Sequence, residues 1–238
     1  MTENLKAGTV FFLLCLPSLN AQADGIVVDK VYHPYVDALE NELEYRMVIQ
    51  DAQEGLQTPA EIHQFSIGTS FGSKLFAEFY AIGTKNRQDN FHLGAWEAEL
   101  KWQLTEQGEY FADWGIFFEY ENEVELDKNE ITVGILTEKE FGRFSGTANL
   151  MLINEWGEDI VNEYETVLAT QIRYRHSRTF EPAIEFYAGQ NARGIGPVIQ
   201  GNISLSLRKT LHWETGVIFG LGNDSPNSSY RFLIEYEF

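Results

Sequence analysis

The sequence predicts an all-β chain that closes into an up-and-down antiparallel barrel of 12 strands across a membrane. Apolar and polar residues alternate along most of its length, which is the period of a strand and not of a helix. The alternating segments run for about 10 to 13 residues, longer than the usual soluble strand and long enough to cross a bilayer when tilted. The last of them, "YRFLIEYEF", keeps its apolar face as far as Phe238.

Composition excludes some classes of partner. The 238 residues carry a formal net charge of −19. Nucleic acid requires a basic surface, so nucleic-acid binding is not expected. The same charge gives no polybasic attraction to anionic lipid head groups, although acidic surfaces also serve solubility alone.

The N-terminus has the features of a secretory signal peptide over residues 1–23. Lys6 precedes an apolar run that is too short to span a bilayer, and "AQA" provides a cleavage site after Ala23. The only cysteine, Cys15, lies in this segment, so we expect no disulfide in the mature chain. Residues 24–38 then form a periplasmic leader, which either packs into the barrel mouth as a small plug or binds a periplasmic partner. The barrel is predicted over 39–238, and no later stretch is apolar enough for a transmembrane helix.

The alternation is clearest in "YETVLATQIRYRH", which as a helix would scatter Glu and Arg over its apolar side. As a strand it places Tyr164, Leu168 and Ile172 on one face and Gln171 and Arg173 on the other. The same test gives strands at 39–50, 62–71, 74–83, 91–104, 110–121, 129–137, 143–154, 164–176, 180–189, 198–208, 211–222 and 229–238.

The connections and the aromatic residues support a membrane barrel. Longer polar connections, such as "EWGEDIVNEY" and "GQNARGIGP", alternate with short ones such as "FGS" and "RKT". This alternation is typical of a barrel with long outer loops and short periplasmic turns. Aromatic residues near the short turns indicate an interfacial girdle, and the predicted members include Phe71, Phe76, Trp102, Tyr110, Phe141, Phe144, Tyr174, Phe180 and Trp213.

With its signal, long alternating strands, alternating loops and aromatic ending, the chain resembles a porin-like Gram-negative outer-membrane β-barrel protein. The resemblance implies a location in the outer membrane and recognition of the last strand by the outer-membrane barrel assembly machinery. The residues assigned to this assembly signal are Tyr230, Phe232, Ile234, Tyr236 and Phe238. Physically, the last strand must pair with the first to leave no open edge in lipid.

If the apolar faces meet the lipid bilayer, the alternate positions line a lumen in which acidic residues outnumber basic ones. The predicted lumen-lining residues are Glu97, Glu99, Lys101, Asp113, Glu119, Arg173, Arg175, Glu181, Glu185, Arg208, Glu214 and Arg231. An open acidic lumen would favour cations. Alternatively, Arg and Glu on neighbouring strands pair into ladders that fill it, and a 12-stranded barrel lies between filled and open sizes.

Signs of catalysis and of cofactors are weak. His176 and Ser177 are adjacent, so in a strand they point to opposite faces. His212 and Glu214 share a face, but no serine is matched to them. The acidic run "ENEVELDKNE" lacks the glycine and spacing of a calcium loop, and no metal or other cofactor is predicted.

The sequence therefore predicts a small porin-like channel for small solutes or cations, with no enzymatic activity. Two other classes stay open: a non-conducting structural or interaction barrel, and a membrane-embedded lipid hydrolase or acyltransferase. The permeant, the oligomeric state and the openness of the lumen are not determined by the sequence.

Overall fold

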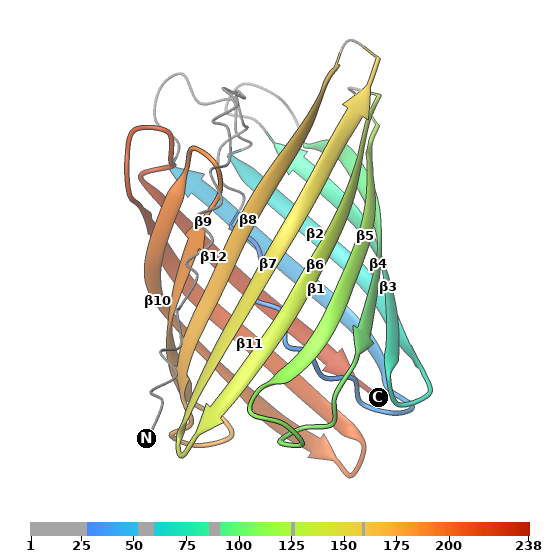
Figure 1. Ribbon diagram of the computed structural model, residues 1–238, viewed down its shortest axis with the longest axis vertical. Coiled ribbons are helices and arrows are strands. Elements are labelled where there is room, and N and C mark those ends of the chain that lie inside the picture. Colours follow the sequence, from blue (N-terminus) through green and yellow to red (C-terminus); the bar gives the residue numbers. More distant parts are fainter. Residues whose placement is uncertain (1–27, 52–59, 86–90, 125–126, 159) are drawn as a thin grey trace, which may run out of the picture.

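A computed structural model describes residues 28–51, 60–85, 91–124, 127–158 and 160–238, which form a closed barrel (Figure 1). Its strands are β1 (Asn41–Asp51), β2 (Glu61–Phe71), β3 (Leu75–Lys85), β4 (His92–Gln103), β5 (Asp113–Glu123), β6 (Lys128–Phe141), β7 (Phe144–Gly157), β8 (Ile160–Tyr174), β9 (Glu181–Ala188), β10 (Arg193–Ser206), β11 (Lys209–Gly220) and β12 (Ser228–Glu237). Each of the 12 strands coincides with a predicted segment, so the predicted fold class and strand number are confirmed.

Every strand pairs antiparallel with its neighbours in the sequence, and β1 pairs with β12 to close the ring. The closing ladder extends from Glu42 opposite Glu237 to Asp51 opposite Ser228. The backbone of Phe238 adds two hydrogen bonds, because its N–H donates to the carbonyl of Asn41 and its carbonyl accepts from the Asn41 N–H. A closed ladder leaves no backbone edge to face hydrocarbon, which is the requirement for spanning a bilayer with strands.

The outer wall is apolar over its whole circumference. Large apolar side chains point away from the lumen on successive strands, among them Ile67, Phe79, Ile135, Leu152 and Ile184, each about half exposed. Such a band on a soluble protein would far exceed the usual apolar patch, whereas lipid accepts it. Within the described residues no helix is both long and apolar enough to cross a membrane.

Both Phe238 and the start of β1 lie at the lower end of the barrel in Figure 1, together with the turns β2–β3, β6–β7 and β10–β11. We call this the periplasmic end, following the prediction from turn length, and the opposite one the outer end.

The strict alternation of loop length is not observed. The β7–β8 connection comprises only residues 158–159, and the β9–β10 connection only residues 189–192. In both places the strands continue through residues predicted to be loop. Gly194 and Gly196 lie in β10, and at Gly196 an added Cβ would meet the Val217 carbonyl oxygen, so a glycine permits the close approach of β11.

Phe76 was assigned to the interfacial girdle, and this assignment is wrong. Its side chain is buried, 5% exposed, and shares the lumen face of β3 with Glu78 and Tyr80. Lys101 on β4 lies opposite, with its Nζ 5.3 Å from the centroid of the Phe76 ring. The alternation between lipid-facing and lumen-facing positions does not continue across the turn before β3. The face of Phe76 therefore cannot be inferred from the pattern of the preceding strand. Phe71 and Phe141, by contrast, are exposed at the ends of their strands.

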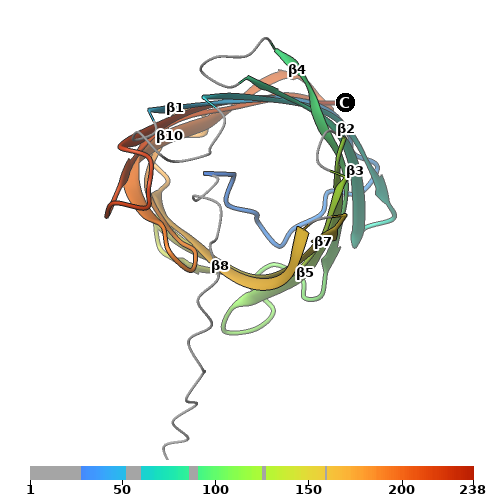
Figure 2. The same cartoon turned by 90° about the horizontal axis from the view of Figure 1, so that it is seen from above.

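The first described residues do not belong to the wall. Residues 28–38 cross the interior of the ring, as Figure 2 shows in the view along the barrel. Val28 packs near the outer ends of β10 and β11, and Glu40 reaches the periplasmic rim, where its N–H donates to Ser70 Oγ. The predicted signal peptide over 1–23 lies outside the described residues. We call residues 28–38 the inner segment.

The closing contacts of Phe238 generate a prediction about assembly. Substitution Phe238→Ala removes the final outward aromatic residue while leaving its two backbone hydrogen bonds possible. We expect a smaller fraction of the protein to reach the membrane as a closed barrel, measured by its faster gel migration before heating than after.

The matched control is Phe111→Ala. Phe111 is 84% exposed in the β4–β5 connection at the same end and takes no part in closing the ring. Equal assembly of both variants and the unchanged chain would contradict the role of Phe238 as part of an assembly signal.

Candidate channel lumen

The structure places most of the predicted lumen residues on the inner wall. Glu97, Glu99, Asp113, Glu185 and Glu214 are buried carboxylates there. Glu119, Lys101, Arg173, Arg175 and Glu181 are half-buried on the same side of their strands, and Arg231 is 1% exposed. Arg208 differs: it is exposed in the β10–β11 turn, because a register shift at Ser204 to Ser206 ends β10 before it.

Carboxylates occupy directly opposite positions on consecutive strands. Glu97 pairs with Glu121, Glu121 with Glu130, and Glu130 with Glu155. Going the other way around the barrel, Tyr80 and Ser66 connect Glu97 to Glu44. The full set, which we call the carboxylate row, is Glu235, Glu44, Ser66, Tyr80, Glu97, Glu121, Glu130, Glu155 and Glu163.

The carboxylate row climbs from one end of the barrel to the other. Glu235 lies near the end of β12 at the periplasmic end, and Glu163 lies near the start of β8 at the outer end. Strands in a closed barrel are tilted, so positions that face each other across successive strands drift along the barrel axis. A second row runs beside the first, with Glu78 opposite Glu99 and Glu99 opposite Glu119.

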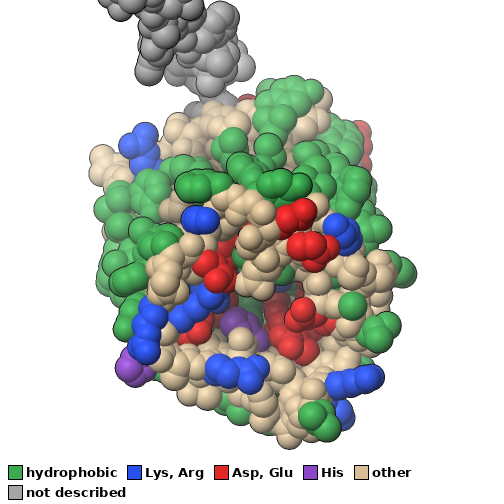
Figure 3. All heavy atoms as spheres, turned by 60° about the horizontal axis from the view of Figure 1, so that its bottom comes forward, with side chains coloured by type: hydrophobic (Ala, Val, Ile, Leu, Met, Phe, Trp, Pro, Cys, Tyr) green, Lys and Arg blue, Asp and Glu red, His purple; other side chains and the backbone are tan. Residues whose placement is uncertain are grey.

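Like charges directly opposite one another destabilise a sheet, and burial strengthens the effect. Oε1 of Glu97 has no hydrogen-bond partner among the described residues although the side chain is 4% exposed. Figure 3, which looks toward the periplasmic end, shows acidic side chains gathered in and around a central hollow within an apolar wall. This wall therefore holds many acidic side chains close together at a cost in stability.

Lys128 on β6 pairs with Glu155 of the row at 3.1 Å, and the arginines gather on and beside β8 and β12. Arg231 lies 2.8 Å from Glu185 and 2.9 Å from Glu214 through Nη2, and it donates to the Tyr187 hydroxyl through Nη1. Arg175 lies 2.5 Å from Glu140, and Arg173 lies 3.4 Å from both Glu138 and Glu181. On this side the interior contains Arg–Glu ion pairs. Such pairs were predicted for the whole lumen as the alternative to an open channel.

The inner segment is held in the lumen from both sides by charges. Asp29 places Oδ1 2.6 Å from Nη1 of Arg46, and its carbonyl accepts from Tyr187 and Arg231. Lys30 donates to Glu44 Oε2 and to the Tyr80 hydroxyl, both at 2.8 Å. Burial alone would lower the pKa of Lys30, but the carboxylates of Glu44 and Glu78 outweigh it and raise this pKa well above its ordinary value. Lys30 is therefore charged inside the barrel.

The backbone of the inner segment is satisfied by wall side chains. The Tyr32 N–H donates to Asn149 Oδ1 at 2.7 Å, and Asn149 Nδ2 donates to the Tyr32 carbonyl at 2.8 Å. The Val36 N–H donates to Gln103 Oε1 at 2.7 Å. Buried peptide groups need such partners, so Asn149 and Gln103 replace the strand neighbour that this segment lacks.

Further contacts continue to the periplasmic end. The Tyr32 hydroxyl donates to Glu99 at 2.6 Å, and Tyr35 donates to Asp113 at 2.8 Å. Nδ1 of His33 lies 2.5 Å from Glu138 Oε2. Beyond these, a cavity of about 560 Å³ opens between Asp37–Asn41 and the ends of β10 to β12, with Arg208 and Phe238 in its lining.

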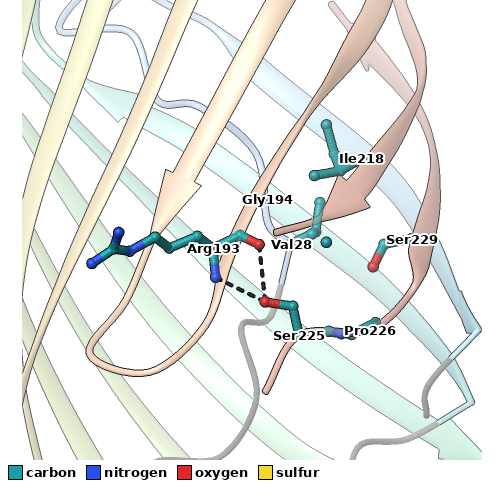
Figure 4. A pocket seen from close by; sticks show the side chains of 8 residues that line it. Val28, Arg193, Gly194, Ile218, Ser225, Pro226 and Ser229 are labelled. Carbon is teal, nitrogen blue, oxygen red and sulfur yellow. Dashed lines mark hydrogen bonds between the residues drawn. The ribbon is translucent and has the colours of Figure 1, made fainter. Parts of the chain in front are cut away.

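Apolar packing fixes the other end of the inner segment. Val28 and Val31 join Ala169, Tyr187 and Ile218 in a buried cluster. Figure 4 shows Val28 beside Gly194 and Ile218, near Ser225, whose Oγ accepts from the Arg193 N–H and donates to the Arg193 carbonyl. The inner segment therefore spans the lumen from the outer part of β10 to the periplasmic rim.

Sequence reasoning missed the wall residues that hold this segment. Asn149, Tyr80 and Tyr187 contact it but were not among the predicted site residues. Asn149 is fully buried on the lumen face of β7, between Thr147 and Met151, and a buried amide there suggests a backbone to be bound. No local signal identifies that backbone as Tyr32, which is 117 residues away.

No family model matches the chain, and no curated protein matches it either. Solved structures do. A KdgM porin in complex with disordered oligogalacturonate aligns with a TM-score of 0.58 and 11% identity, covering 83% of this chain and 99% of that one. An outer membrane channel from Pseudomonas putida F1 aligns with a TM-score of 0.60 and 11% identity, over 89% and 99% of the two chains.

The chain has a porin-like outer-membrane β-barrel fold. The beta domain of the Bordetella autotransporter BrkA aligns as well, with a TM-score of 0.55, 10% identity and coverage of 84% and 99%. Because one fold carries several functions, the activity of this barrel has to be argued from its lumen.

The two hydrogen bonds between Asn149 and Tyr32 give a testable prediction. Substitution Asn149→Leu leaves a buried N–H and a buried carbonyl without partners, at about 1–3 kcal/mol each. We expect amide hydrogen exchange in residues 28–38 to become at least about tenfold faster, measured on the barrel in detergent micelles.

Substitution Asn154→Leu on the same strand is the control, since Asn154 bonds to Asn162 and Glu163 and not to the inner segment. Unchanged protection of residues 28–38 in Asn149→Leu would show that these bonds do not hold the segment in the lumen.

Proposed function

We propose that this barrel is a narrow channel for small cations, with the carboxylate row as its conduction path and the inner segment as its closing element. The observation that carries the proposal is the like-charged register from Glu97 through Glu121 and Glu130 to Glu155. A wall that served only to fill the barrel would gain stability from opposite charges at these positions. A lumen lined by carboxylates instead concentrates cations and lowers the barrier to their passage.

Continuity of the row favours conduction over a single binding site. Carboxylates occupy every step from Glu97 to Glu163, and the hydroxyls of Ser66 and Tyr80 bridge the interval between Glu44 and Glu97. Conduction requires several sites of moderate affinity and not one tight site. The basic residues on β8 and β12 lie mostly to the side of this path and are engaged by Glu138, Glu185 and Glu214.

A non-conducting barrel is the second candidate, and the inner segment is the observation that favours it. Val28, Val31 and Tyr32 are buried inside the lumen, which reduces the space for a solute in the described arrangement. The two candidates differ in whether the inner segment leaves the lumen. A similar fold does not decide the permeant: the aligned KdgM porin was solved with oligogalacturonate, an acidic sugar chain, whereas the lumen described here is acidic.

Current in planar bilayers tests the path. Under a salt gradient we expect a cation-preferring reversal potential, which falls by roughly half in the double substitution Glu97→Gln and Glu121→Gln because two steps of the row lose their charge. Glu109→Gln, at an exposed position in the β4–β5 connection, is the control with the same kind of charge change. A reversal potential that does not differ between these variants would contradict the row as the path.

The role of the inner segment has its own prediction. Since Asn149→Leu weakens the hold on Tyr32, we expect its channels to open more often than those of the unchanged chain, with the same single-channel conductance. If both proteins insert as closed barrels but carry no current, the non-conducting candidate is correct.

A further inference from the structure

The ammonium group of Lys30 lies within the carboxylate row, at a position where the wall supplies everything needed to bind a cation. Its Nζ is 2.8 Å from Glu44 Oε2, 2.8 Å from the Tyr80 hydroxyl oxygen and 3.6 Å from Glu78 Oε2. A primary ammonium has three N–H donors, and three wall oxygens surround this one. Glu42 is a third buried carboxylate within reach of the same point.

The wall around Lys30 is built and buried. Glu44 is 1% exposed, Glu78 is 5% exposed and Tyr80 is fully buried. Ser66 donates to Glu78 and so fixes that carboxylate. Oε1 of Glu44 has no hydrogen-bond partner among the described residues, and Nε of Arg46 lies 3.6 Å from it.

The ammonium of Lys30 also lies near two aromatic rings. Nζ of Lys30 lies 5.5 Å from the centroid of the Tyr80 ring and 5.2 Å from that of Tyr32. Aromatic faces at this distance attract a cation, and of the two rings Tyr80 belongs to the wall and Tyr32 to the inner segment. A bare metal ion would use the wall oxygens alone, whereas an ammonium also uses the face of the Tyr80 ring.

We propose that Glu44, Glu78 and Tyr80 form a binding site for the ammonium end of linear primary amines, and that Lys30 occupies it as an internal substitute for such a ligand. This inference rests on the proposed function, because it identifies primary amines as a solute class that competes with the inner segment for the row. An amine that takes the place of Lys30 removes one of the contacts that hold residues 28–38. The same site therefore binds the solute and weakens the closing element.

The test uses Lys30→Ala in the full chain, which removes the internal ammonium and its stem and leaves the wall intact. The probe is n-butylammonium, which has the length of the missing side chain, and tetramethylammonium is the comparison cation because it has no N–H donor. Calorimetric titration of the barrel in detergent should show saturable binding of n-butylammonium at least about tenfold tighter to Lys30→Ala than to the unchanged chain.

Two controls locate the site. Adding Glu44→Gln to Lys30→Ala should abolish the gain, whereas adding Glu109→Gln should leave it unchanged. Equal affinity of n-butylammonium for Lys30→Ala and the unchanged chain would overturn the inference, as would an equal gain for tetramethylammonium or a gain that survives Glu44→Gln.

If Lys30→Ala does not fold, the unchanged chain provides the measurement. Hydrogen exchange of residues 28–38 should accelerate as n-butylammonium chloride is raised and should not do so in tetramethylammonium chloride at the same ionic strength. Equal exchange in the two salts would overturn the inference.

Neither assay depends on current, so the two proposals fail separately. A cation-selective channel without the amine effect would retain the proposed function alone. Amine binding to a barrel that carries no current would retain the site alone.

Discussion

Closure of β1 against β12 is the constraint on which the rest of this structure depends. Hydrocarbon offers no hydrogen bonds, so each strand must find partners on both sides, and the ladder from Glu42–Glu237 to Asp51–Ser228 completes the ring. Once the ring is closed, each side chain of a strand faces either the lipid or the lumen. The apolar set faces out, and therefore the many carboxylates of the chain are forced together inside.

The interior resolves this crowding in two ways. Carboxylates on β6, β9 and β11 are matched by Arg173, Arg175 and Arg231. Elsewhere carboxylates oppose one another from Glu97 to Glu155, with Lys128 paired to Glu155 at one end of that run. Near the lower half of the row, Lys30 on the inner segment and Arg46 on β1 engage Glu44. The inner segment thus supplies both charge that the wall lacks and the peptide groups that Asn149 and Gln103 bind. Its removal would leave Glu44 without the ammonium of Lys30 and the amides of Asn149 and Gln103 without their backbone partners.

The strands and their faces could be predicted from sequence because both are local properties. Glu97, Glu99 and Glu185 alternate with apolar residues on their own strands, and no knowledge of the partner strand is needed to place them inside. The predicted face was wrong at Phe76, where a turn separates it from the preceding strand. The predicted start of β10 was wrong because Gly194 and Gly196 suggested a loop, whereas these glycines permit a close approach of the neighbouring strand. The like-charged row was not predicted, since it depends on register across several strands. The position of the inner segment was one of two alternatives, because contacts such as Asp29 with Arg231 join residues 202 apart.

The continuity of the inner segment with β1 through Leu39 and Glu40 has a consequence for any competitor. A displaced segment stays covalently attached at the periplasmic rim, so its return is an intramolecular event with an effective concentration of the order of millimolar for a short linker. A free solute that occupies the Lys30 position has to reach a comparable concentration or bind more tightly. Such a barrel responds to a high concentration of solute and not to a low one. The solute concentration that is needed depends on the length of chain between Lys30 and β1.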